Sequence, residues 1–238
     1  MTAEPVRVDL DAPGGRVSGL WMPAPGAVAA AVIAHGAGAP MTHPFMEGAA
    51  AGLVAGGVSV LRFNFPFMEE GRRRPDPPPV LLRTWRAAID ALERRRAGLP
   101  MILGGKSLGG RIASMAAARD GAACPASALV FFGYPLHPAG QTDRLRDAHL
   151  PDIRVPMLFI QGTRDALARF DLVQALIRRL EPLARLHVVP DADHAFHVRG
   201  ARRPDGDAGR ALGLVAADYV RSIAGEVSAR RARSSAAE

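Results

Sequence analysis

Cysteine and lysine are almost missing from this sequence of 238 residues, which contains each of them once, as Cys124 and Lys106. A lone cysteine cannot form an intrachain disulfide, so a small secreted scaffold held together by disulfides is excluded. The longest uninterrupted apolar stretch, residues 27–34, is far shorter than the roughly 20 residues of a membrane span. Residues 1–9 show no basic segment followed by an apolar stretch, so we expect no signal peptide. We therefore expect a cytoplasmic protein without a membrane partner.

Negative charge is also in short supply, since 23 Asp and Glu stand against 30 Lys and Arg and the formal net charge is +7. All the basic residues except Lys106 are arginine, and they form short clusters such as Arg72–Arg74 and Arg94–Arg96. A nucleic-acid-binding protein usually gathers its cations on one element and mixes them with aromatic or base-reading side chains. These clusters lie instead at expected helix ends and in a proline-rich loop, where solvated charge is usual. We therefore expect no nucleic-acid partner and interpret the charge as an arginine bias.

Apolar strand-like runs alternate along the chain with amphipathic helical stretches. This pattern is typical of an α/β protein with a mostly parallel central sheet and helices on both faces. Strands are expected at residues 6–10, 16–22, 30–34, 58–63, 101–104, 128–132, 157–160 and 186–189. Helices are expected at residues 80–96, 108–119, 171–180 and 208–224. The first two strands are expected to form an antiparallel hairpin, because a proline- and glycine-rich turn separates them.

The length and the apolar content of 48% fit one domain with a packed core. We assign this domain to residues 1–224. Residues 225–238, rich in Ser, Arg and Ala, are expected to form a flexible C-terminal tail. No stretch of additional sequence is long enough for a large cap domain.

The strongest local motif is Gly105-Lys-Ser-Leu-Gly109, between the expected strand at residues 101–104 and the helix that follows. A G-x-S-x-G sequence in this context is typical of a nucleophile elbow, a strand-to-helix turn too sharp for side chains at the glycine positions. The turn exposes the hydroxyl of Ser107 at the end of the sheet. The backbone N–H of Leu108, at the start of the helix, is a candidate oxyanion donor.

A nucleophilic serine needs a histidine base and an acid that orients it, and in α/β-hydrolases the acid precedes the histidine in the chain. Asp165 follows one predicted strand and His194 follows the last one, so both lie where a doubly wound sheet places its ligand-binding loops. His197 is the competing histidine. Asp191 and Asp193 are competing acids whose alternative role is to shape the turn.

The loop His35-Gly-Ala-Gly38 ends the third expected strand and precedes the first long helix. Its small residues fit the loop that supplies the second oxyanion N–H, for which Ala37 is the candidate, and they equally fit a plain strand-to-helix turn. No metal site is expected, because the histidines are scattered and neither an H-E-x-x-H nor a C-x-x-C motif is present. No cofactor is expected either.

These motifs together resemble the α/β-hydrolase superfamily over about residues 16–224. The sequence is more closely similar to the branch that includes testis-expressed protein 30 and the third subunit of the NSL chromatin complex. The segments that carry this closer resemblance are residues 35–38, 62–66, 71–79, 104–111, 133–138, 161–165 and 193–194. Dienelactone-hydrolase-like proteins are more distant relatives, many of which have a cysteine nucleophile where this chain has Ser107.

The resemblance implies a hydrolase fold with Ser107, Asp165 and His194 as the catalytic triad. It implies no particular substrate. We predict a serine hydrolase acting on a small ester or related acyl compound, with no cofactor and a small-molecule acyl substrate as its partner. The alternative is an interaction module that keeps the hydrolase fold with its catalysis lost or incidental. The Arg72–Arg74 loop has two interpretations, an anion-binding border of the active site or a solvated surface loop.

Overall fold

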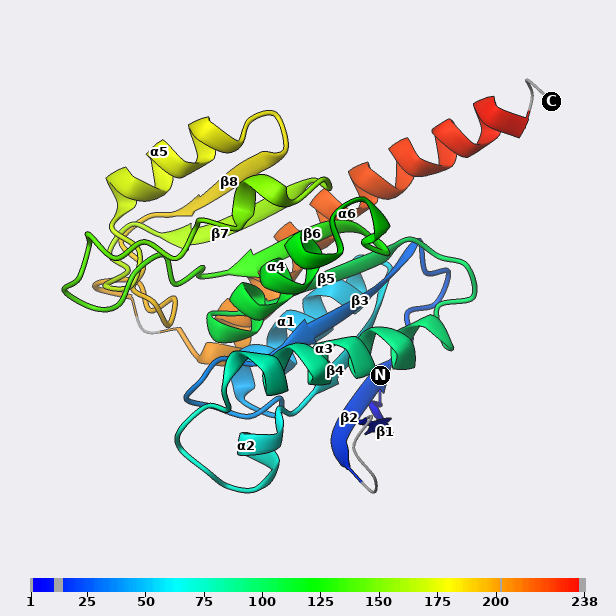
Figure 1. The fold of residues 1–238 in the computed structure, drawn as a ribbon, viewed down its shortest axis with the longest axis horizontal. Helices are drawn as coiled ribbons and strands as arrows, with labels where there is room; N and C mark the ends of the chain where they lie inside the picture. Colours follow the sequence, from blue (N-terminus) through cyan, green and yellow to red (C-terminus); the bar gives the residue numbers. More distant parts are fainter. Residues whose placement is uncertain (1, 11–14, 202, 236–238) are drawn as a thin grey trace.

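Eight strands form one sheet in the order β1-β2-β4-β3-β5-β6-β7-β8 (Figure 1). The computed structural model describes residues 2–10, 15–201 and 203–235. The strands are β1 (Glu4–Asp9), β2 (Arg16–Met22), β3 (Ala29–Ala34), β4 (Val58–Phe63), β5 (Met101–Lys106), β6 (Ala126–Phe132), β7 (Met157–Gly162) and β8 (Ala184–Val189). β1 and β2 form the expected hairpin, β2 pairs with β4 in the antiparallel direction, and β3 to β8 run parallel. The chain therefore has the predicted α/β-hydrolase architecture.

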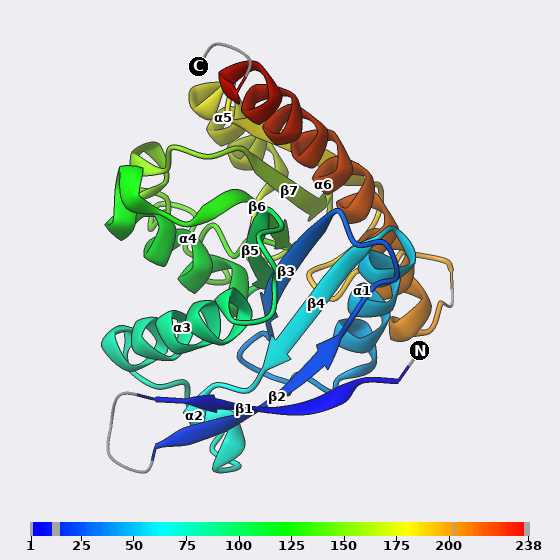
Figure 2. The same ribbon diagram turned by 90° about the vertical axis from the view of Figure 1, so that its right-hand side faces the viewer.

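The helices form a layer on each face of this sheet (Figure 2). They are α1 (Pro44–Ala55), α2 (Pro66–Glu69), α3 (Pro78–Glu93), α4 (Leu108–Asp120), α5 (Phe170–Leu180) and α6 (Asp205–Ser235), with short 3-10 turns at Gly121–Ala123 and Leu150–Asp152. α3, α4 and α5 contribute to the core on one face, whereas α1 and α6 contribute to the core on the other. Because both faces are covered, β3, β4 and β7 are buried along their entire length, which explains why their sequences are mostly apolar.

Glycines allow α1 and α6 to pack backbone against backbone. A Cβ atom at Gly52 would lie 2.3 Å from the Arg210 carbonyl oxygen, and one at Gly209 would lie 2.2 Å from the Phe45 carbonyl oxygen. These separations are far below van der Waals contact, so no side chain fits between the helices at these positions. This close packing fixes the N-terminal ends of α1 and α6 next to each other.

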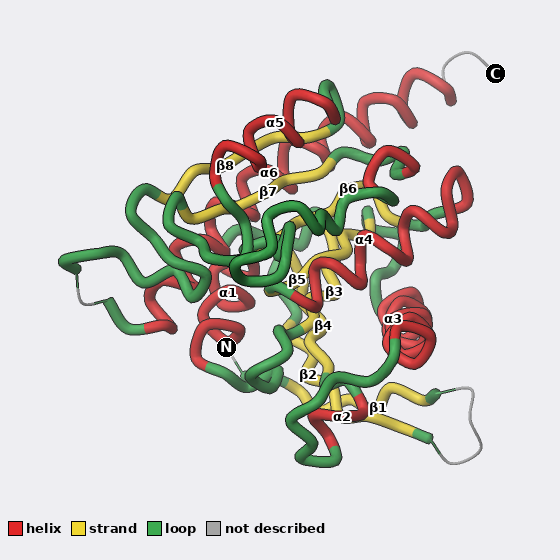
Figure 3. The backbone as a smooth tube through the Cα atoms, turned by 60° about the vertical axis from the view of Figure 1, so that its left-hand side comes forward, coloured by secondary structure: helices red, strands yellow, loops and turns green. Residues whose placement is uncertain are grey.

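The loops that follow β6, β7 and β8 lie together at the carboxyl end of the parallel strands (Figure 3). Within the described residues no inserted cap domain covers this end of the sheet. Open α/β sheets bind their ligands at this end. In the same part of the chain, no helix is both long and apolar enough to cross a membrane.

The structure departs from the sequence predictions at the C-terminal helix and in the segment after β4. The last helix was expected at residues 208–224, but α6 begins at Asp205 and continues to Ser235, so the boundary predicted after residue 224 falls inside a helix. Residues 236–238 of the predicted tail lie outside the described part. The short helix α2 lies in a segment for which no helix was predicted, and Pro66 at its first position favours a helical start.

Candidate active site

Ser107 lies in a sharp turn between β5 and α4. Its backbone angles are φ 51° and ψ −114°, in a region that a residue with a side chain rarely adopts. The two glycines of the motif are required here, since a Cβ at either Gly105 or Gly109 would lie 2.3 Å from the Ala34 carbonyl oxygen. Strain at a single residue held by its surroundings is characteristic of functional positions. The turn directs the Ser107 hydroxyl away from the sheet and toward the loop that carries His194.

His194 and Asp165 continue a chain of hydrogen bonds from this hydroxyl. The Ser107 Oγ lies 2.8 Å from His194 Nε2, and His194 Nδ1 lies 2.7 Å from Asp165 Oδ2. An ionised aspartate only accepts, so the Nδ1 position carries a proton and Nε2 of the neutral imidazole is free to accept from the serine. The structure thus brings together the three side chains that the sequence predicted, from the loops after β5, β7 and β8.

Asp165 is held in place by donors of its own. Its side chain is buried, its Oδ1 accepts from the Leu167 backbone N–H at 2.7 Å, and its Oδ2 accepts from Gln161 Nε2 at 2.5 Å. Gln161 is itself fixed, because its side-chain oxygen accepts from the Tyr134 N–H at 2.9 Å. No sequence motif predicted a role for Gln161. The available signal was a polar residue in the apolar strand that leads to Asp165.

His35 shapes the loop that contains Ala37. Its Nδ1 donates to the Gly36 carbonyl oxygen at 2.6 Å, and its Nε2 accepts from the Phe65 N–H at 3.0 Å. A trans peptide points the Ala37 N–H in the direction opposite to the Gly36 carbonyl, so this contact also fixes the direction of the candidate oxyanion donor. Burial lowers the pKa of His35 to about 4, and the ring is therefore a neutral positioning group.

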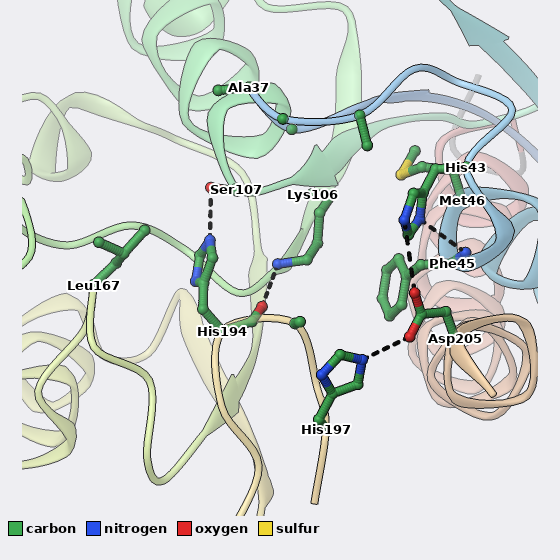
Figure 4. A pocket seen from close by; sticks show the side chains of 14 residues that line it. Ala37, His43, Phe45, Met46, Lys106, Ser107, Leu167, His194, His197 and Asp205 are labelled. Atoms are coloured by element: carbon green, nitrogen blue, oxygen red, sulfur yellow. Dashed lines mark hydrogen bonds and ion pairs between the residues drawn. The ribbon is translucent and has the colours of Figure 1, made fainter. Parts of the chain in front are cut away.

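A cavity of about 470 Å³ opens beside Ser107 and His194 (Figure 4). Near the serine its lining includes Ala37 and Leu167, and Phe45 extends the apolar wall. A histidine–aspartate cluster also lines this cavity: His197 Nε2 lies 2.7 Å from Asp205 Oδ1, and His43 Nε2 lies 3.6 Å from Asp205 Oδ2. The site is therefore an apolar cavity with a nucleophile-like serine and a separate polar cluster.

Comparisons with known proteins identify the family of the chain. A family model described as an alpha/beta hydrolase domain matches residues 27–218. The chain belongs to the alpha/beta hydrolase family. This assignment covers the sheet from just before β3 onward, together with α1 to α5 and the first part of α6.

Solved structures of other alpha/beta hydrolases have the same fold. A dienelactone hydrolase from Anabaena variabilis superposes with a TM-score of 0.73 at 23% identity, covering 93% of this chain and 97% of its own. An alpha-beta serine hydrolase homologue from Coxiella burnetii gives 0.71 at 21% identity, covering 90% and 97%. A serine hydrolase without a lid from Xanthomonas campestris gives 0.63 at 24% identity, covering 83% and 88%. At these identities the likeness extends to the fold alone.

The residues that competed with His194 and Asp165 for the roles of base and acid have other partners. His197 is bonded to Asp205, and this bond raises the pKa of its imidazole. Asp193 accepts from the Ala195 and His197 backbone N–H groups, both at 2.9 Å, and so shapes the turn that presents His194. Asp191 donates its N–H to the Thr163 hydroxyl. None of these contacts connects to Ser107.

The Arg72–Arg74 loop lies outside the cavity lining. Its arginines are exposed, and Arg72 forms ion pairs with Glu70 and Asp76 at 2.6 and 2.7 Å. These contacts fit the interpretation as a solvated surface loop. Across the described residues no cluster of three or more His, Cys, Asp or Glu side chains could hold a metal ion.

Proposed function

We propose that this alpha/beta hydrolase is a serine hydrolase that acts on a small ester or related acyl compound, with Ser107, His194 and Asp165 as its triad. The observation that carries the proposal is the continuous hydrogen-bonded chain from Asp165 to the Ser107 hydroxyl, which ends at an apolar cavity. A connected triad favours catalysis over the alternative of an interaction module. The branch that includes testis-expressed protein 30 and the NSL subunit is part of this proposal, carried by the sequence motifs alone.

In the proposed mechanism the Ser107 oxygen attacks the acyl carbon while its proton passes to His194 Nε2. Asp165 stabilises the imidazolium that results and keeps the ring in its tautomer. The N–H groups of Ala37 and Leu108 donate to the oxyanion of the tetrahedral intermediate. His194 then protonates the leaving group, and an acyl-enzyme on Ser107 remains. Water, activated by His194 in the same way, attacks the acyl-enzyme and releases the acid.

The cavity limits the size and polarity of the substrate, whereas the triad defines only the type of bond that is attacked. Its apolar lining fits an acyl or alcohol group of small to medium size, and the absence of a cap within the described residues leaves the site accessible. Structural neighbours include an esterase domain from Rhodothermus marinus and the dienelactone hydrolase, which supports an ester rather than an amide. The same residues would also transfer the acyl group to an alcohol or amine.

A fluorophosphonate probe tests the proposal directly, because it phosphorylates only a serine that a neighbouring base has activated. The purified chain is expected to gain one adduct, located by mass spectrometry at Ser107. The matched variants are Ser107→Ala, which is expected to lose the adduct, and Ser114→Ala, which is expected to keep it. Ser114 is a suitable control since it is buried and bonded to His149, away from the cavity.

The substrate is then sought with p-nitrophenyl esters of increasing acyl length. Hydrolysis that requires Ser107 and falls as the acyl chain outgrows the cavity supports the proposal. A folded protein that neither labels nor hydrolyses any ester contradicts it. A stoichiometric protein partner whose binding is unchanged by Ser107→Ala would then favour the interaction module.

A further inference from the structure

The only lysine of the chain lies directly beside the proposed triad. Lys106 is the last residue of β5 and immediately precedes Ser107. Its ammonium group donates a hydrogen bond of 2.5 Å to the backbone carbonyl oxygen of His194 (Figure 4). The bond joins the end of a central strand to a loop 88 residues away in sequence. It is a direct side-chain contact between the serine turn and the backbone of the histidine itself.

The ammonium occupies a narrow space. It lies 5.1 Å from the ring centre of Phe196 and 5.9 Å from that of Phe45, and these two rings stack on each other at 5.4 Å. Gly133 closes the space on another side: a Cβ added there would lie 3.1 Å from the Lys106 nitrogen and 3.6 Å from the His194 ring. The ammonium and the imidazole therefore lie against the same backbone position and close to each other.

The narrow space around the ammonium group explains why position 106 is a lysine rather than an arginine. Lysine carries a compact charge on a slender stem, whereas arginine carries a broad planar fork. Everywhere else in the sequence the basic residue is arginine. The one exception occurs at the position where aromatic rings and a carbonyl group leave room for a compact cation only.

The positive charge of Lys106 and the negative charge of Asp165 have opposite effects on protonation of the His194 imidazole. A nearby anion favours the protonated imidazolium and a nearby cation disfavours it. Burial lowers the pKa of Lys106 to about 8, while Asp165 and Asp193 act in the opposite direction. Other ionisable groups of the cavity, His43, His197 and Asp205, form their own cluster. At neutral pH the lysine is therefore mostly a cation, and a cation beside an imidazole disfavours the imidazolium.

We propose that Lys106 is a positioning residue for His194: its hydrogen bond holds the histidine loop at the distance that Ser107 needs, and its charge disfavours protonation of the imidazole. The catalytic consequence rests on the proposed hydrolase function. The structural part, a lysine coupled to the histidine, can be tested without any substrate.

The kinetic test compares Lys106→Met and Lys106→Arg with the wild type on an ester that the enzyme hydrolyses. Arg73→Met is the matched control, because it removes one exposed positive charge outside the cavity. Lys106→Met is expected to lower kcat by about 10- to 100-fold, as misplacement of a general base does, with a smaller effect on KM. The acidic limb of its pH–kcat/KM profile is expected to move up by about half a pH unit to one unit.

Lys106→Arg is expected to restore the position of the acidic limb in part, because the charge is kept, while kcat stays low because the fork does not fit. Arg73→Met is expected to leave both kcat and the acidic limb of the pH–kcat/KM profile unchanged. A Lys106→Met enzyme with wild-type kcat and an unmoved acidic limb would overturn the proposal.

A second measurement uses the wild-type chain and needs neither hydrolysis nor a Lys106 variant. Labelling with ¹⁵N-lysine gives one side-chain ammonium signal, since the chain contains one lysine. This signal is expected to shift in the pH range where the His194 ring titrates, with the ring signal assigned by its loss in His194→Gln. An ammonium signal that does not respond to that titration contradicts the coupling. If the coupling is observed but no ester is hydrolysed, the proposed function fails and the positioning contact stands.

Discussion

At the residue scale, His35 links the stability of the chain to pH. The ring is buried, donates to Gly36 and accepts from Phe65, so protonation would break the second contact and place a charge in the core. Its pKa is about 4 in the folded state and 6.5 in an ordinary environment. The unfolded state therefore binds the proton first as the pH falls, and folding stability decreases from pH 6.5 down to about 4.

The expected loss over this range is about 3 kcal/mol at most, from 1.36 kcal/mol for each unit of pKa difference. Urea unfolding between pH 7 and 4.5 measures it. His35→Gln, which keeps a donor and an acceptor but does not titrate, is expected to be less stable at pH 7 and to show a shallower pH dependence. His187→Gln is the control for removing a histidine whose pKa is also lowered by burial. His187 lies partly exposed on the edge strand β8, whereas His35 is fully buried.

Equal slopes for wild type and His35→Gln would contradict a buried neutral His35. A secondary outcome concerns the proposed oxyanion donor, whose direction depends on His35. The His35→Gln variant is expected to react with the fluorophosphonate more slowly than the wild type, by more than its fraction of unfolded protein at pH 7 explains. The reason is that loss of one oxyanion donor typically costs about 10²- to 10³-fold in turnover.

The site also shows which residues a sequence pattern can identify. Ser107, Asp165 and His194 were predictable because each follows a recognisable strand, and parallel strands deliver their following loops to one edge. Gln161, His35 and Lys106 were visible as residues but not as contacts. Their roles depend on the direction of a side chain relative to a residue that is distant in sequence, and no periodicity encodes that.

At the element scale, the backbone contact between α1 and α6 determines what lines the cavity. His43 precedes α1 and Asp205 begins α6, so their approach depends on the glycines that let these helices touch. The predicted strands agreed well with the structure, because continuous apolar runs identify strands covered on both faces. The cluster of His43, His197 and Asp205 was not predicted, since it arises from helix packing rather than from any local motif.

Gly209→Ala tests this contact. The added methyl group would meet the Phe45 carbonyl oxygen at 2.2 Å, and a backbone atom cannot turn aside as a side chain can. We expect a loss of about 1–3 kcal/mol in the free energy of unfolding, the usual cost of overpacking. Chemical denaturation with circular dichroism as the readout measures it.

Gly225→Ala on the same helix is the matched control, because nothing lies within 4 Å of its added methyl group. It is expected to stabilise the chain by up to about 1 kcal/mol through helix propensity alone. If both variants changed stability in the same direction and by the same amount, helix propensity rather than close packing would explain the effect.

At the scale of the whole molecule, the family match covers most of the chain, but it ends at residue 218 and the last part of α6 lies beyond it. In Figure 1 the C-terminal turns of this helix extend past the sheet and away from the other elements. The sequence placed the domain boundary after residue 224. Among the described side chains of α6, Val220, Ile223 and Ala224 are buried, and Val227 is partly buried and packs against the core from the edge.

Two truncations locate the boundary of the folding unit. A chain that ends at Val227 retains every buried residue of α6 among the described side chains, so we expect its Tm to stay within about 2 °C of the full chain and its labelling at Ser107 to be unchanged.

A chain that ends at Tyr219 loses Val220, Ile223 and Ala224 from the core. Burial of an aliphatic side chain such as valine or isoleucine contributes about 1.5–3 kcal/mol each, which is a large share of the stability of a domain. This chain is therefore expected to unfold at a markedly lower temperature or to aggregate. A large fall in Tm for the chain that ends at Val227 would place the boundary beyond it and would mean that the projecting turns contribute to the fold.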